Sequence, residues 1–329
     1  MFTIVLAKAI IKAAEIGDVD LLKNIIQAND KWKQSIEWTS KTDKKGRTAL
    51  HIAVISDKIS VVRFVANEIK REVADIKLRD QYLNVPDNKG RTPLFFSSAL
   101  GFLDVTKFLL GRGAKINSQT NEYHPAPGST ALMAAAEKGH KECFTALMDS
   151  NADIFAQRSD GADALYLATR EGRKEIIEMI VKTDKIKILC RDIINRPTYR
   201  ERTAIFTAAF HGYLEIGKIL FNSGAELDIQ DKDDFTPLIL AAHEGHLDFV
   251  KWLIRTRVSI CKTDKFGDTA LETAEINGHL QTMKYLAQIS TRKVLIFPKE
   301  YKFKKLCEAH ETELQKMKYI SRLIHIWKG

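Results

Sequence analysis

The stretch DFTPLILAAHEGHLDFVKWLI, residues 234–254, holds two short apolar segments separated by a glycine. Thr236 and Pro237 open the first segment. A threonine side chain can cap the free N–H groups of a helix, and a proline in the first turn loses no hydrogen bond. Gly245 favours the left-handed conformation that ends a helix. The stretch therefore predicts two short helices, one before Gly245 and one after it.

The pattern of residues 234–254 recurs along the chain. Corresponding segments start at Gly46, Gly90, Gly128, Gly161, Glu201 and Gly267, and residues 9–26 keep only the helical half. The positions equivalent to Thr236 lie 44, 38, 33, 40, 33 and 33 residues apart, at Thr48, Thr92, Thr130, Asp163, Thr203, Thr236 and Thr269. One such segment is too small to bury its own apolar face, so repeats of this kind are stabilised by stacking on neighbours.

These segments resemble the ankyrin repeat family, whose pattern is a turn, T-P-L-H-x-A-A, a glycine and V-V-x-x-L-L. The resemblance spans roughly residues 5–290 and implies an all-α ankyrin-repeat solenoid of about eight helix-turn-helix repeats with β-hairpin-like fingers. Repeats are expected to start near residues 5, 43, 87, 125, 158, 198, 231 and 264. Steps longer than 33 residues predict loop insertions, including irregular segments at 111–128 and 183–200.

Individual residues depart from the repeat pattern or occupy a marked place in it. Asp57 stands where the other repeats have a glycine, and Asp163 stands where they have a threonine, so local strain is expected at both. His51 fills the histidine position of T-P-L-H, and the resemblance implies a structural hydrogen bond within the turn.

His243 and His246 flank Glu244, which raises the question of a zinc site. A zinc-binding helix needs two histidines four residues apart on one uninterrupted face. These two are three apart, with the helix-ending Gly245 between them, and a Gly-His step recurs at His140 and His279. We therefore expect no metal site. The four cysteines are widely spaced, which indicates neither a disulfide framework nor a zinc site.

No arrangement of nucleophile and base stands out from the repeat pattern, so the chain is predicted to be non-catalytic and to bind no cofactor. The competing hypothesis is an enzyme whose active site is completed by residues 183–200 or by the C-terminal segment. The formal net charge is +9, and residues 291–329 alone carry ten Lys or Arg against four Glu. Nucleic acid is therefore not an expected partner of the repeats. The N-terminal residues suit neither a signal peptide nor a membrane span, which predicts a cytoplasmic, intracellular protein.

The resemblance implies that another protein binds to the finger tips and to the exposed face of each first helix. The chain is expected to be monomeric. The chain would then be an adaptor, scaffold or inhibitor. The alternatives are that the lysines are merely solvated and that the apolar residues pack on an inserted loop. The candidate residues are Lys44, Lys45, Arg47, Asn88, Lys89, Arg91, Leu100, Arg158, Arg170, Arg202, Phe210, His211, Phe235, His243, Phe266 and Ile276.

Residues 291–329 leave the repeat and form a basic segment with apolar residues at helical spacing. A helical C-terminal extension is predicted, either as a cap on the last repeat or as a membrane-surface tether. Its run Cys307, Glu313, Leu314, Met317 and Lys318 resembles the start of the PRANC region that follows ankyrin repeats in some pathogen and parasite proteins. That resemblance implies a further alternative, a host-directed effector or ubiquitin-ligase adaptor that would act in the host cytosol.

Overall fold

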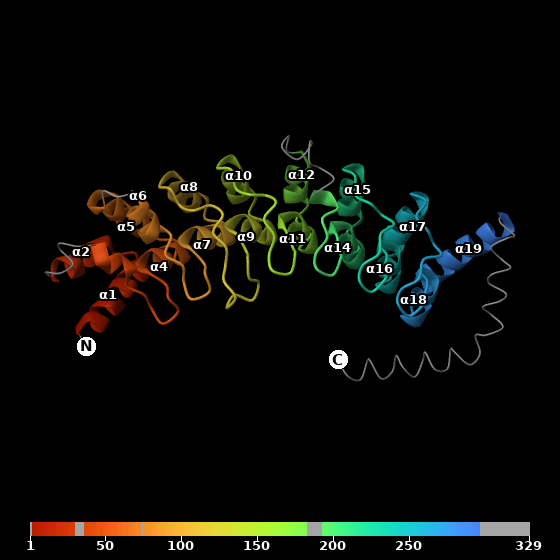
Figure 1. The fold of residues 1–329 in the computed structure, drawn as a ribbon, viewed down its shortest axis with the longest axis horizontal. Helices are drawn as coiled ribbons and strands as arrows, with labels where there is room; N and C mark the ends of the chain where they lie inside the picture. The colour runs from red at the N-terminus through yellow and green to blue at the C-terminus, as the bar shows by residue number, and fades with distance from the viewer. Residues whose placement is uncertain (1, 30–35, 74–75, 183–192, 297–329) are drawn as a thin grey trace. The chain divides into compact units, whose positions relative to one another are not determined.

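A computed structural model describes residues 2–29, 36–73, 76–182 and 193–296. Within them the regular elements are helices (Figure 1). Two isolated antiparallel bridges, Thr42–Thr48 and Thr263–Thr269, lie just before helices α4 (Ala49–Ile55) and α18 (Ala270–Ile276). The chain divides into two compact units, Met1–Tyr199 and Arg200–Gly329, here called the N-terminal and C-terminal units. The predicted all-α fold is confirmed.

The N-terminal unit contains five helix pairs. Its first helices are α1 (Phe2–Ile16), α4 (Ala49–Ile55), α7 (Pro93–Leu100), α9 (Ala131–Lys138) and α11 (Ala164–Arg170). Their partners are α2 (Val19–Gln27), α5 (Ile59–Glu72), α8 (Leu103–Gly111), α10 (Lys141–Asp149) and α12 (Lys174–Lys182). A 3-10 helix, η1 (Ile36–Ser40), precedes α4, and an extra helix, α6 (Ile76–Leu83), fills the longest step between repeats.

The C-terminal unit contains three pairs: α14 (Ala204–His211) with α15 (Leu214–Asn222), α16 (Pro237–His243) with α17 (Leu247–Arg255), and α18 (Ala270–Ile276) with α19 (Leu280–Ile296). The eight pairs of the described residues agree with the predicted repeat number. Helix α19 continues through residue 290, and residues 297–329 lie outside the described residues. Of the expected helical extension, only the part in α19 up to Ile296 is therefore described. Its expected roles as a cap, a membrane tether or a ligase adaptor concern residues that lie outside the described part of the chain.

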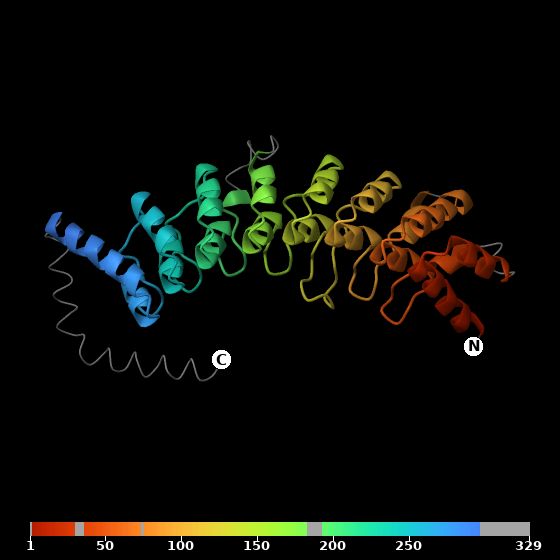
Figure 2. The ribbon, with the colours of Figure 1, turned by 180° about the vertical axis from the view of Figure 1, so that it is seen from behind.

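In each unit the first helices stack in chain order: α7 contacts α4 and α9, and α16 contacts α14 and α18. The loops before the first helices project away from the second helices, as both ribbon views show (Figure 2). We call these loops fingers. Apolar side chains between the two helix layers are fully enclosed, such as Val61 and Val65 of α5 and Phe249 and Leu253 of α17.

The helix ends follow the residue types that the sequence places there. Thr92, Thr130 and Thr236 each accept a hydrogen bond from a backbone N–H of the first helical turn. Gly101 ends α7 with a φ of 78°, a left-handed conformation that favours glycine. Asp57 takes the same conformation, with a φ of 53°, which confirms the expected strain there.

Candidate protein-binding surface

Each regular finger is built around one aspartate. The Oδ1 atoms of Asp43, Asp87, Asp231 and Asp264 accept hydrogen bonds of 2.8–3.0 Å from the backbone N–H groups two and four residues ahead. Burial opposes ionisation of Asp87, but the Arg91 guanidinium and these N–H groups outweigh it and lower the pKa of the carboxyl. The turn and the charge of the aspartate therefore stabilise each other.

Backbone hydrogen bonds also join neighbouring fingers. In the N-terminal unit, Asn88 N donates to Lys45 O (3.0 Å), Asn121 N to Lys89 O (3.1 Å), Ser159 N to Pro127 O (2.9 Å) and Tyr199 N to Asp160 O (3.1 Å). In the C-terminal unit, Lys232 N donates to Arg200 O and Lys265 N to Asp233 O, both at 3.1 Å. These bonds hold the finger tips of each unit in fixed register.

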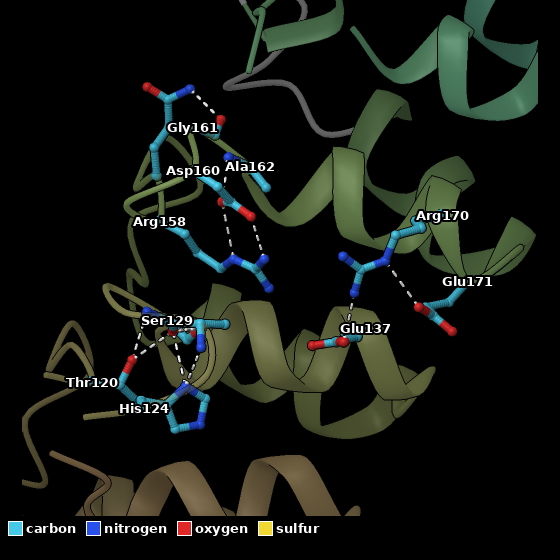
Figure 3. A network of polar contacts seen from close by, with 12 residues as sticks. Thr120, His124, Ser129, Glu137, Arg158, Asp160, Gly161, Ala162, Arg170 and Glu171 are labelled. Carbon is cyan, nitrogen blue, oxygen red and sulfur yellow. Dashed lines mark hydrogen bonds and ion pairs between the residues drawn. The ribbon is translucent and has the colours of Figure 1, made fainter. Parts of the chain in front are cut away.

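The irregular finger at residues 120–129 keeps this register by other means (Figure 3). Thr120 replaces the aspartate, and its backbone N–H donates to Ser129 O (3.0 Å). His124 Nδ1 accepts from the Ala126 N–H (3.0 Å), and the His124 ring meets Phe95 of α7 edge-on. The tip residue Tyr123 is 72% exposed.

The predicted arginines are held in ion pairs within a repeat or between neighbouring repeats. Arg47 binds Asp43 (2.6 Å), Arg91 binds Asp87 (2.7 Å) and Arg202 binds Asp231 (2.7 Å). Arg170 lies between Glu137 (2.7 Å) and Glu171 (3.0 Å) (Figure 3). Their charges are therefore largely used inside the fold.

Arg158 departs from the expected exposed position. It is 8% exposed, and its guanidinium binds the Asp160 carboxylate at 2.5 Å (Figure 3). In this finger Arg158 stands where regular fingers have the aspartate, and Asp160 accepts the hydrogen bond from the Ala162 N–H instead. The side chain is therefore part of the finger and not of its outer surface.

The predicted lysines are different. Lys44 and Lys45 are exposed, Lys89 is half-buried, and no ion pair joins them to another described residue. Asn88 lies between these fingers, and its Nδ2 donates to Lys44 O (3.1 Å).

The apolar candidates expose large side chains. Leu100 on α7, Phe210 on α14, Phe266 on a finger and Ile276 on α18 are 40–51% exposed. His211 packs on the edge of Phe210 (5.0 Å between ring centroids) and stacks on Tyr213 (5.3 Å). Phe235 is half-buried against His243, with 6.4 Å between their centroids.

The histidines near Gly245 have structural partners. His246 Nε2 donates to Phe210 O (2.9 Å) and His279 Nε2 to His243 O (2.8 Å), each reaching the preceding repeat. His140 makes the same bond to Ala99 O (3.1 Å). His243 Nδ1 contacts Glu244 Oε1 (2.7 Å). Helix α16 ends at His243 and α17 begins at Leu247, so His243 and His246 share no helix; among the described residues no cluster of three metal-ligating side chains occurs.

Two exposed aromatic residues escaped the sequence prediction. Tyr123 and Tyr199 are 72% and 67% exposed at the tips of fingers that lack the usual aspartate. The sequence signal for them was weak. Both tyrosines lie in segments, around Glu122 and Thr198, that align poorly with the regular fingers, so their position at a finger tip could not be read from the repeat pattern. Within the described ranges, every helix is too short or too polar to cross a bilayer.

Comparison with known proteins agrees with this geometry. The family model described as ankyrin repeats in three copies matches residues 10–120, 117–192 and 205–294. The B-cell lymphoma 3 protein homolog of Mus musculus is 23% identical over 236 residues, which cover 62% of this chain and 50% of that protein. The B-cell lymphoma 3 protein of Homo sapiens is 24% identical over 236 residues, covering 62% and 49%.

Alpha-latrotoxin-Lh1a of Latrodectus hasselti is 30% identical over 146 residues, covering 44% of this chain and 10% of the toxin. The chain thus matches about half the length of the two lymphoma proteins and a tenth of the toxin. The family model covers most of the chain in three consecutive matches that follow the observed helix pairs. The chain belongs to the ankyrin repeat family.

Proposed function

We propose that this chain is a non-catalytic binding module that holds a partner protein on its fingers and on the outer faces of its first helices. It would act as an adaptor, scaffold or inhibitor. The observation that carries the proposal is the exposure of Leu100, Phe210, Phe266 and Ile276 on these elements. Large apolar side chains among polar neighbours are typical anchors of protein interfaces.

The hydrogen bonds between fingers support the same proposal. Because the finger tips are already fixed in register, a partner that binds there orders little additional backbone. Less conformational entropy is then lost on binding, which favours affinity. The polar side chains of the fingers would supply specificity around the apolar anchors.

The experiment compares two double variants of the full-length chain. Leu100→Glu with Phe210→Glu changes two first-helix residues, one in each unit. Leu21→Glu with Phe221→Glu changes two residues of matched type and similar exposure on second helices α2 and α15. Phe210 and Phe221 each touch a neighbouring ring, His211 and Trp252, so the packing losses are comparable.

Proteins that copurify with each variant from cells expressing it are quantified by mass spectrometry, and thermal unfolding checks the fold. We expect the first-helix variant to lose the partners that the wild type and the second-helix variant retain. Partners lost equally from both variants, or retained by both, would contradict the proposal.

A further inference from the structure

Two neighbouring fingers of the N-terminal unit, at residues 43–48 and 87–92, carry three lysines. Lys44, Lys45 and Lys89 have no ion pair with a described residue. The carboxylates beside them are already engaged: Asp43 and Asp87 each bind an arginine and two backbone N–H groups. Glu15, whose pKa is lowered mainly by Lys12, is paired with that lysine at 2.7 Å.

Aromatic and apolar side chains lie beside Arg91, two residues after Lys89. The Arg91 guanidinium covers the Phe96 ring at 4.5 Å, and Phe95 packs edge-on against both Phe96 (6.2 Å) and His124 (5.8 Å). Leu100 is four residues after Phe96 and so lies on the same face of α7. Helix α7 itself carries no charged residue. The surface therefore joins an apolar strip on α7 to a row of free lysines.

The row formed by Lys44, Lys45 and Lys89 is short. Its far side is bounded by the finger at residues 120–129, where Glu122 is exposed, and by the finger at 158–163, where Arg158 and Asp160 neutralise each other. Burial, and beyond it the charges of Arg91 and Lys89, lower the pKa of His124, which disfavours a positive charge on that ring. A row of three lysines matches a short acidic segment and not the long phosphate backbone of a nucleic acid.

We propose that the fingers at 43–48 and 87–92, together with the outer face of α7, bind an acidic peptide segment of the partner that carries an apolar anchor residue. The lysines attract the carboxylates, and Leu100 with the Phe96 edge receives the anchor. This inference rests on the proposed binding function and specifies the chemistry of the partner at one place.

The geometry allows a clean test of the lysines. The main-chain carbonyl groups of Lys44, Lys45 and Lys89 take part in the finger-to-finger hydrogen bonds, but their side-chain ammonium groups make no bond to a described residue. Charge reversal by Lys44→Glu, Lys45→Glu and Lys89→Glu therefore leaves the fingers intact. The control reverses three exposed lysines outside the fingers, Lys107→Glu, Lys115→Glu and Lys284→Glu, with the same change in net charge.

The probe is a displayed library of random peptides of about 12 residues, which span roughly 40 Å when extended. Peptides selected on the immobilised full-length chain are sequenced, and their affinities are measured by fluorescence anisotropy at low and at about 0.15 M salt. Single-stranded poly(U) and phosphatidylserine vesicles are measured in parallel. Circular dichroism confirms that every variant is folded.

We expect acidic peptides with a leucine or aromatic residue to be enriched. Their binding should weaken at least about tenfold in the finger-lysine variant and on raising the salt, and should be unchanged in the control variant. Selected peptides without acidic residues, or peptides that the finger-lysine variant still binds, would overturn the inference. If the peptides that overturn the inference still failed to bind the Leu100→Glu and Phe210→Glu double variant, the proposed binding function would stand.

Poly(U) or vesicles that bind the wild type more tightly than any peptide, and lose binding in the finger-lysine variant, would overturn the inference in favour of a different class of partner. If no peptide depended on the lysines or on the Leu100 and Phe210 pair, the proposed function would fail together with the inference. The two failures are therefore distinguishable.

Discussion

His51 and Asp163 are both buried near the start of a first helix, yet burial moves their pKa values in opposite directions. The His51 pKa falls from 6.5 to about 4, because desolvation disfavours the imidazolium. The neutral ring accepts from the Thr48 N–H (3.1 Å) and donates to Arg91 O (3.0 Å), which confirms the expected structural role. Its contribution to stability is therefore present above pH 6.5 and is lost as the pH falls toward about 4.

Asp163 gives the opposite pH dependence. Burial raises the pKa of its carboxyl from 3.8 to about 6, so the folded chain binds more protons than the unfolded chain between these values. The free energy of unfolding therefore decreases as the pH rises through this window and stays lower above it. A shift of about two units corresponds to at most about 3 kcal/mol.

Asp163→Thr keeps an oxygen acceptor for the Tyr166 N–H and removes the buried charge. We expect the variant to be more stable than the wild type by about 1–3 kcal/mol at pH 7.5, and to lose this advantage near pH 4. Denaturant unfolding at both pH values measures the difference. An equal gain at both would show that ionisation of Asp163 is not the cause.

Arg257 adopts a φ of 65° in the loop after α17, where the loop after α15 has Gly224 with a φ of 99°. The left-handed conformation costs an L-residue about 1–2 kcal/mol, and glycine avoids this cost but loses more chain entropy on folding. We expect Arg257→Gly to stabilise the chain by about 0.5–1 kcal/mol. Gly224→Ala should destabilise the chain by a similar amount. This cost comes from the backbone conformation alone, because a Cβ there meets no atom within 4 Å. Thermal unfolding of both variants tests the pair, and shifts of the same sign would contradict it.

At the scale of elements, a ring-over-glycine contact joins successive repeats. The His246 ring lies over Gly212, which ends α14, and donates to Phe210 O of that helix. His140 over Gly101 and His279 over Gly245 repeat the arrangement. Each glycine is thus required twice, once for its positive φ and once because a Cβ would lie only about 2.5 Å from the imidazole.

Gly212→Ala and Gly278→Ala separate these two requirements. Both glycines have similar φ values, 70° and 74°, but a Cβ on Gly278 meets no atom within 4 Å. We expect Gly278→Ala to cost about 1 kcal/mol, from the backbone alone, and Gly212→Ala to cost about 1–3 kcal/mol more, from the clash with His246. Denaturant unfolding of the full chain measures both.

A double variant then identifies the origin of the difference. Adding His246→Ala to Gly212→Ala removes the ring, so the additional cost of the alanine should largely disappear in a double-mutant cycle. Equal costs at the two glycines, or a full cost that persists without the ring, would show that the His246 ring does not cause the additional cost at Gly212.

For the whole molecule, each repeat is stabilised mainly by the repeats on either side, so stability should vary along each unit. Helix α9 is in contact with α7 and α11, and its residues Ala131–Ala136 are all buried. Helix α1, by contrast, leaves Val5 and Ile16 at least half exposed. The interior of the N-terminal unit is thus more fully packed than its first pair.

We expect amide hydrogen exchange to be slowest in α9 and α11 and fastest, among the helices of this unit, in α1 and α2. Exchange of the full-length chain followed by mass spectrometry measures the order. Uniform protection from α1 to α12 would mean that the N-terminal unit opens as a whole rather than repeat by repeat.

The sequence by itself determined the family, the helix pairs and their ends. It could do so because threonine caps, helix-ending glycines and apolar spacing act over only a few residues. It also predicted that His243 and His246 share no helix, since the helix-ending Gly245 between them is a local feature.

The tertiary structure alone decided which candidate side chains are available to a partner. Arginine and lysine bring the same positive charge to the fingers, but Arg91 and Arg202 reach buried aspartates while Lys44 and Lys45 do not. Arg158 is buried because its finger replaces the usual aspartate. Arg202 and Asp231 lie in different repeats, 29 positions apart, so no local sequence pattern contains their contact. The Arg91–Asp87 and Arg158–Asp160 pairs join residues only four and two positions apart, but each pair depends on how the folded finger places the two side chains.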